Sequence, residues 1–268
     1  MHQALNSTDI DALAARLDDA ARAARAIAQL SAETVLDLDS AYAVQAASIG
    51  RRLARGERQI GVKMGFTSRA KMVQMGVSDL IWGRLTDAMH LAADAELPFR
   101  RFIHPRAEPE IAFRLARPLT GHVSIEEAMA AVDGIAPAIE IIDSRYADFR
   151  FSLTDVVADN SSSSAFVTGE WVDPAGLGSE EIPIELLVDG TVVESGTSTA
   201  ILGNPWQSLV DAARLASVNG PGLAAGWIVM AGAATAAHAL APGMRVGVRA
   251  GAIGETGFRV SGQRGAQA

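Results

Sequence analysis

Two glutamates separated by one residue, Glu108 and Glu110, stand in the segment 104–113. Because strand side chains alternate between faces, these two carboxylates point the same way if the segment is extended. Like charges so close together repel each other in a half-buried strand, and each also loses hydration. A hard cation such as Mg²⁺ or Mn²⁺ removes both difficulties and prefers oxygen ligands. The pair therefore indicates a metal site, although an exposed edge strand with two solvated glutamates fits the same pattern.

A third carboxylate, Glu140, interrupts a short apolar run that has the length and β-branched content of a strand. Charged residues inside such runs are rarely buried unless they are paired or bind a metal. Glu140 shares a face with Ala138 and Ile142. Three carboxylates on two strands are able to form an open oxygen site. A buried salt bridge to Arg145 or Arg106 would explain Glu140 equally well.

Lys63 lies in a second alternating segment, residues 59–66, whose other face is apolar. Gly61 and Gly65 flank the lysine, and glycine on both sides leaves open space of the kind found where a ligand lies against backbone. A lysine at such a place suits anion binding, proton transfer or a Schiff base. A surface lysine on an edge strand is the competing interpretation.

The next stretch, 67–76, is predicted to form a short helix, followed by a loop at 77–85 that contains Gly83. This stretch fits either a lid or a packed surface helix. Residues 155–164 are small and polar enough to line a cavity, and they also fit an exposed serine-rich loop.

The N-terminal part, residues 1–58, is predicted to be helical, and residues 59–268 form a β-rich part continuous with it. One alanine-rich amphipathic helix is expected from Ser7 to about Leu30, and a second from about Asp39 to Arg55. The remaining predicted elements are a helix at 124–132, a hairpin turning at 189–190, a helix at 205–218 and strands at 227–230, 244–248 and 257–260.

Composition excludes several classes of protein. The 268 residues carry a formal charge of −8 without a basic cluster, which disfavours a general nucleic-acid binder. The absence of cysteine excludes disulfides, thiolate nucleophiles and cysteine-ligated metal sites. The sequence shows no secretory signal and no apolar run that would span a membrane. A cytoplasmic protein is therefore expected.

Four blocks together resemble the fumarylacetoacetate hydrolase-like superfamily, and within it the 2-keto-4-pentenoate hydratase/4-oxalocrotonate decarboxylase branch of aromatic meta-cleavage pathways. The resemblance extends roughly from Ser40 to Val260. It implies an α+β fold, a mixed β-sandwich or roll with a helical N-terminal part. It also implies that Glu108, Glu110 and Glu140 bind Mg²⁺ or Mn²⁺. The four blocks are 61–68, 104–113, 136–145 and 157–163.

Hydratases of this branch carry an acidic residue two positions before the glycine that matches Gly83, where this chain has Ile81. With His104 and Pro109 framing the glutamates, this departure implies a carboxy-lyase. Its expected reaction converts 2-oxohex-3-enedioate to 2-hydroxypenta-2,4-dienoate and CO₂. The remaining residues expected at the catalytic and substrate-binding site are Lys63, Asp79, Arg69, Ser161 and Thr235.

Two other functions stay open at this stage. A hydratase would share the metal site but would need a general base, for which Asp79 and His104 are candidates. A non-catalytic subunit that stabilises a partner enzyme would have no need of a clustered charge site. The expected partners are a small 2-oxo dienedioate substrate, further copies of the chain in a homo-oligomer, and the hydratase of the pathway.

Overall fold

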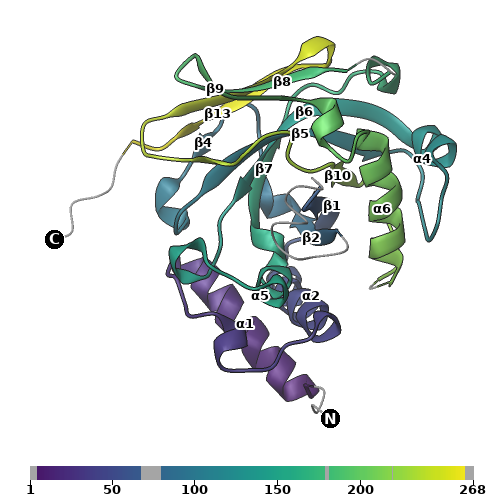
Figure 1. The fold of residues 1–268 in the computed structure, drawn as a ribbon. Helices are drawn as coiled ribbons and strands as arrows, with labels where there is room; N and C mark the ends of the chain where they lie inside the picture. Colours follow the sequence, from purple (N-terminus) through teal and green to yellow (C-terminus); the bar gives the residue numbers. More distant parts are fainter. Residues whose placement is uncertain (1–4, 68–79, 179–180, 219, 263–268) are drawn as a thin grey trace.

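The computed structural model describes residues 5–67, 80–178, 181–218 and 220–262 of the chain (Figure 1). Two β-sheets pack against each other, helices α1, α2 and α5 gather at one end of the molecule, and α6 lies along one side (Figure 1). The helices are α1 Ser7–Ala23, α2 Leu38–Ala54, α4 Ile125–Ala131, α5 Leu153–Ala158 and α6 Pro205–Val218. These elements confirm the predicted α+β class.

The larger sheet has the order β2-β1-β10-β5-β6-β7-β3, with β11 paired to β5, and the smaller has the order β4-β13-β12-β8-β9. Strands of the larger sheet are β1 Gln59–Gly65, β2 Ile81–Thr86, β3 His90–Leu91, β5 Arg106–Leu115, β6 Val132–Ile142, β7 Ser163–Thr168, β10 Ile228–Met230 and β11 His238–Ala239. Strands of the smaller sheet are β4 Glu96–Leu97, β8 Pro183–Val188, β9 Thr191–Thr197, β12 Arg245–Ala250 and β13 Gly254–Val260.

The larger sheet curls into a roll, because β2 at one edge contacts β7 near the other edge. Its outer face packs against the smaller sheet and the helices, and supplies Ile111, Phe113 and Ile139 to the main hydrophobic core. Its inner face lines the interior of the roll and carries a smaller apolar cluster. Strand alternation thus gives each long strand one side in the core and one side facing the interior of the roll.

Helices α1 and α2 are joined by buried charge. The Asp18 carboxylate, almost fully buried, accepts hydrogen bonds from Arg51 at 3.0 Å and from Arg55 at 2.6 and 2.7 Å. The prediction that the first helix continues to about Leu30 is wrong. The helix ends at Ala23, because Ala24 adopts a left-handed conformation (φ 46°) and the chain turns to pair with the segment after β6.

The prediction of a loop over 77–85 is wrong from residue 81 onward, where β2 begins. Gly83 is not a turn residue. A Cβ atom there would lie 2.5 Å from the Asn160 carbonyl oxygen, so glycine permits a close approach of two backbones. The second helix, the helices at 124–132 and 205–218, the hairpin and the three C-terminal strands are confirmed within one to three residues. The helix predicted at 67–76 lies almost wholly outside the described residues.

No helix in the described part of the chain is long and apolar enough to cross a membrane. The division at residue 58 stays a prediction.

The close approach at Gly83 generates a stability prediction. Gly83→Ala should lower the free energy of unfolding by about 1–3 kcal/mol, because the new methyl group meets rigid backbone rather than a flexible side chain. Denaturant unfolding measures the change. Gly50→Ala, inside α2 with no atom beyond the adjacent residues and the backbone of its own helix within 4 Å of the added methyl, is the control and should stabilise by about 0.5–1 kcal/mol. An unchanged stability of Gly83→Ala would contradict the packing described.

Candidate metal centre

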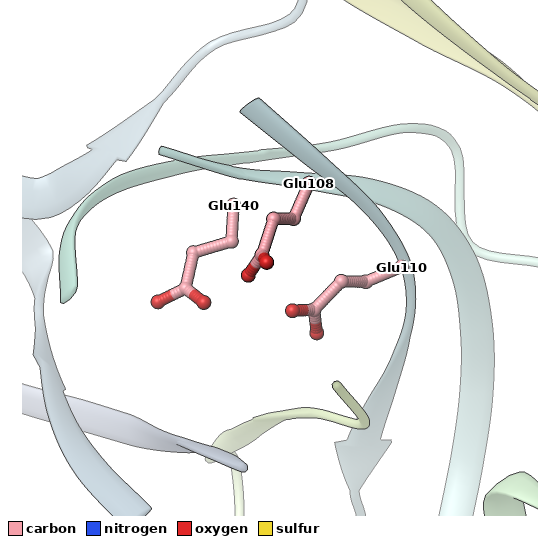
Figure 2. Close-up of side chains that lie close together, drawn as sticks. All are labelled: Glu108, Glu110 and Glu140. Carbon is pink, nitrogen blue, oxygen red and sulfur yellow. The ribbon is translucent and has the colours of Figure 1, made fainter. Parts of the chain in front are cut away.

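Three glutamates converge on the inner face of the roll (Figure 2). Glu108 and Glu110 come from β5, and Glu140 comes from β6 directly opposite Glu108 in the antiparallel register. Each offers one carboxylate oxygen, and these oxygens all lie within 4.8 Å of one another. The alternation expected from the sequence therefore places the three carboxylates on one face.

The hydrogen bonding of these carboxylates is incomplete. Glu110 and Glu140 are fully buried, and among the described residues Oε1 of each has no hydrogen-bond partner. The other oxygen of Glu110 accepts from the Gly232 backbone N–H at 2.8 Å, and that of Glu140 accepts from Lys63 Nζ at 3.0 Å. Buried carboxylate oxygens without partners are costly unless a cation or proton satisfies them. An all-oxygen donor set of this kind fits Mg²⁺ or Mn²⁺.

Burial and the charges of neighbouring groups shift the pKa values of Glu110, Glu140 and Lys63. Burial raises the pKa of Glu110 well above its ordinary value, and the neighbouring Glu140 carboxylate adds to the rise. Burial likewise raises the pKa of Glu140, although Lys63 opposes that rise. For Lys63, burial acts to lower the pKa, but the three carboxylates outweigh it and raise the pKa above the ordinary lysine value. The three carboxylates therefore favour the charged ammonium form of Lys63.

Lys63 is almost fully buried, so the interpretation as a surface lysine is wrong. Its ion pair with Glu140 also replaces the salt bridges that the sequence suggested for that residue. Arg145 binds Asp159 instead, and the Arg106 guanidinium lies 4.5 Å from the centre of the Phe149 ring.

The glycines beside Lys63 serve packing rather than a ligand, contrary to the sequence interpretation. A Cβ atom at Gly61 would overlap the Ile228 backbone of β10. A Cβ atom at Gly65 would lie 2.8 Å from Cγ1 of Ile81, whose side chain covers that position. In the register of β1 and β2, Gly65 faces Ile81 and Lys63 faces Gly83. The Ile81 side chain is thus buried on the same face of the sheet as the Lys63 side chain.

Ser161 and Thr235 make local hydrogen bonds in the structure. The buried Ser161 hydroxyl donates to the Trp82 carbonyl of β2 at 2.9 Å, and the Thr235 hydroxyl donates to the Ala236 carbonyl at 2.9 Å. Their roles in substrate binding stay predictions. Arg69 and Asp79 lie outside the described residues.

Sequence reasoning singled out the segment 155–164 but missed that it holds β2 in place. Asn160, Ser161 and Ser162 all have positive φ angles, between 51° and 59°. The Asn160 side chain accepts from the Arg84 N–H at 2.7 Å and donates to the Arg84 carbonyl at 2.9 Å. Asparagine tolerates this left-handed conformation better than most residues. An asparagine placed before a run of serines is therefore the sequence signal from which this turn could have been predicted. The segment 155–164 therefore supports the strand opposite Lys63 and is not an exposed loop.

The apolar part of the inner face was also missed, because its members come from five separate segments. Their side chains border the charged cluster: Phe166 pairs directly with Glu140, and Ala138 pairs with Glu110. The charged site is thus set in apolar surroundings inside the roll. The buried members of this inner cluster are Leu85, Met89, Ala112, Ala138, Phe166, Ile228 and Met230.

Comparisons with known proteins agree with this geometry. The family described as fumarylacetoacetate (FAA) hydrolase C-terminal matches residues 60–261. A 4-oxalocrotonate decarboxylase of Pseudomonas sp. is 50% identical over 255 residues, covering 95% of this chain and 99% of that protein. A 2-keto-4-pentenoate hydratase of Paraburkholderia xenovorans (strain LB400) is 36% identical, covering 78% of each chain.

A solved structure is similar over nearly the whole chain. It is that of 4-oxalocrotonate decarboxylase from Pseudomonas putida G7, complexed with magnesium and adipate. Its TM-score is 0.91 at 34% sequence identity, and the alignment covers 97% of this chain and 100% of that chain.

The convergence of the three glutamates generates a metal-binding prediction. Glu110→Gln keeps the shape and the acceptor for Gly232 but removes one negative charge, so Mg²⁺ affinity should fall by more than about 100-fold. Without metal, the same variant should unfold at a higher temperature, because a buried like charge has been removed. Calorimetric titration and thermal unfolding measure the two effects.

The control is Glu255→Gln, which removes the same charge from an exposed position on β13. It should leave Mg²⁺ affinity within about twofold of the wild type, since exposed charges act weakly at a distance. Equal Mg²⁺ affinity of Glu110→Gln and the wild type would contradict the assignment.

Proposed function

Because the chain belongs to the fumarylacetoacetate hydrolase family, we propose that it catalyses the metal-dependent decarboxylation of 2-oxohex-3-enedioate to 2-hydroxypenta-2,4-dienoate and CO₂. The observation that carries this proposal is the buried Ile81 side chain on the face that holds Lys63 and the three glutamates. The relatives named 4-oxalocrotonate decarboxylase, one of them 50% identical, favour the same reaction.

The substrate carries a 2-oxo acid at one end, formed by C1 and C2, and the departing C6 carboxylate at the other end. Breaking the C5–C6 bond leaves an electron pair that delocalises through C4 and C3 onto the C2 oxygen. A divalent ion held by Glu108, Glu110 and Glu140 would supply Lewis acidity toward the C1 carboxylate and the C2 oxygen. Lys63, kept protonated by its carboxylate neighbours, places a further fixed positive charge where negative charge develops.

The apolar residues of the inner face act on the departing C6 carboxylate. A charged group that leaves as neutral CO₂ is helped by surroundings that hydrate it poorly. Ile81 provides such surroundings beside Lys63, and a separate apolar cluster with Phe166 and Met230 lies on the same face of the sheet. Water addition would instead need an acid–base group at this place.

A hydratase is the alternative within the same family, because one relative at 36% identity bears that name. Of its two candidate bases, Asp79 lies outside the described residues. The His104 ring packs against Phe149, with 4.9 Å between the ring centres, and the His104 backbone N–H donates to Asp143.

The proposal also includes a homo-oligomer and a complex with the pathway hydratase. The shared family of the decarboxylase and hydratase relatives supports the complex.

One experiment tests the reaction and the role of Ile81 together. Purified protein with Mg²⁺ and 2-oxohex-3-enedioate should release one CO₂ per substrate consumed, and the organic product followed by NMR should be the dienol. Ile81→Asp should slow CO₂ release by about 10-fold or more, because the new carboxylate repels and hydrates the departing one. Ile81→Leu, which keeps the apolar character, is the control and should stay within a few-fold of the wild type.

A hydrated 4-hydroxy-2-oxo acid as the main product would contradict the decarboxylase proposal in favour of a hydratase. Unchanged CO₂ release by Ile81→Asp would contradict the role given to Ile81.

A further inference from the structure

A cavity of about 400 Å³ lies on the opposite side of the larger sheet from the glutamates. Ala165 of β7 lines this cavity, whereas the next residue, Phe166, belongs to the inner face and pairs with Glu140. The other walls come from α1, α2, the segment around β4 and the end of β6. The cavity is therefore separated from the proposed metal site by the sheet itself.

The cavity has an excess of positive charge, although the whole chain is strongly negative. Five arginines and three carboxylate residues line it, and two further carboxylates outside the lining, Asp159 and Asp19, pair with Arg145 and Arg22. The arginines are Arg22, Arg52, Arg55, Arg101 and Arg145, and the carboxylate residues are Asp18, Glu57 and Asp143.

The three carboxylates are already occupied by donors. Both oxygens of Asp18 accept from Arg55, at 2.6 and 2.7 Å. Glu57 accepts from Arg52 at 2.8 Å. Asp143 accepts from two backbone N–H groups of the loop before β5, at 2.7 and 2.8 Å. These groups hold the walls together, and Asp159, just outside the lining, pairs with the buried Arg145.

Of the lining arginines that the structure describes, Arg22 and Arg101 are the two without a close ion pair. Both are exposed at the cavity, and they come from α1 and from the turn Phe99–Arg101, which contact each other. The carboxylate nearest to Arg22 is Asp19 at 3.7 Å, in a pair that is 61% exposed on both sides and therefore weak. Among the described residues, no carboxylate forms an ion pair with Arg101. Two guanidinium groups on neighbouring elements are suited to bind one carboxylate.

Apart from Ser164, the rest of the lining is apolar. A ligand with only charged groups would leave this part of the wall uncovered, whereas an organic anion covers it with its hydrocarbon part. We propose that this cavity is a second ligand site, which binds a small organic carboxylate through Arg22 and Arg101. The apolar residues that would contact its hydrocarbon part are Leu91, Pro98, Phe102 and Ala165.

Calorimetric titration of the Mg²⁺-loaded protein with benzoate at constant ionic strength tests the proposal. Benzamide, which has the same ring without the charge, and inorganic phosphate, which has charge without an apolar part, are the comparison ligands. The wild type should bind benzoate saturably and at least about 10-fold more tightly than either. Arg22→Gln/Arg101→Gln should lose at least about 10-fold in benzoate affinity, the loss expected when charge-assisted hydrogen bonds are removed.

The matched control is Arg25→Gln/Arg100→Gln, which removes the same charge from two exposed arginines that do not line the cavity. It should bind benzoate within about twofold of the wild type. Equal loss in both double variants, no loss in either, or no saturable binding of benzoate to the wild type would each overturn the proposal. Phosphate binding as tight as benzoate binding would overturn the assignment to an organic carboxylate.

Discussion

Three carboxylates and one ammonium group share the inner face of a curled sheet, and the electrostatics of this set constrain the rest of the structure. One lysine cannot balance three glutamates, and within the described part of the chain Glu110 and Glu140 each keep a buried oxygen without a hydrogen-bond partner. Burial in apolar surroundings makes this imbalance more costly, because charges are screened weakly in a low-dielectric interior. A divalent cation would balance the excess negative charge of the three glutamates, and for that reason their carboxylates are suited to bind one.

The sheet has to curl for these groups to meet. Lys63 lies on β1, and two strands, β10 and β5, separate it from Glu140 on β6. The 3.0 Å ion pair across them forms because the sheet closes on itself, so that β1 and β6 approach over the interior of the roll. The left-handed segment around Asn160 takes part in this closure, since its carbonyl approaches Gly83 directly opposite Lys63. The packing of Asn160 against Gly83 on the edge strand β2 therefore helps to position the Lys63 ammonium group inside the roll.

The sequence predicted the parts of the site that depend on strand alternation alone. The i, i+2 spacing of Glu108 and Glu110 and the apolar run around Glu140 were sufficient to place the carboxylates on one face. The partner of Glu140 was not predictable from local pattern, because Lys63 reaches it only through the curvature of the sheet. Gly83 was taken for a loop residue for the same reason: its contact, Asn160, lies far away in the sequence. Glycine signals a close approach as readily as a turn, and only the fold distinguishes the two.

The central claim is that Glu108, Glu110 and Glu140 together hold one divalent ion. Crystals grown with Mn²⁺ and measured at a wavelength where manganese scatters anomalously test this claim most directly. The account predicts one strong anomalous peak at about 2.1–2.3 Å from an oxygen of each of the three glutamates, the spacing of hard cations to carboxylate ligands. A fully occupied Mn²⁺ peak elsewhere in the protein, with Lys63 and the three glutamates unchanged and no peak between them, would contradict it.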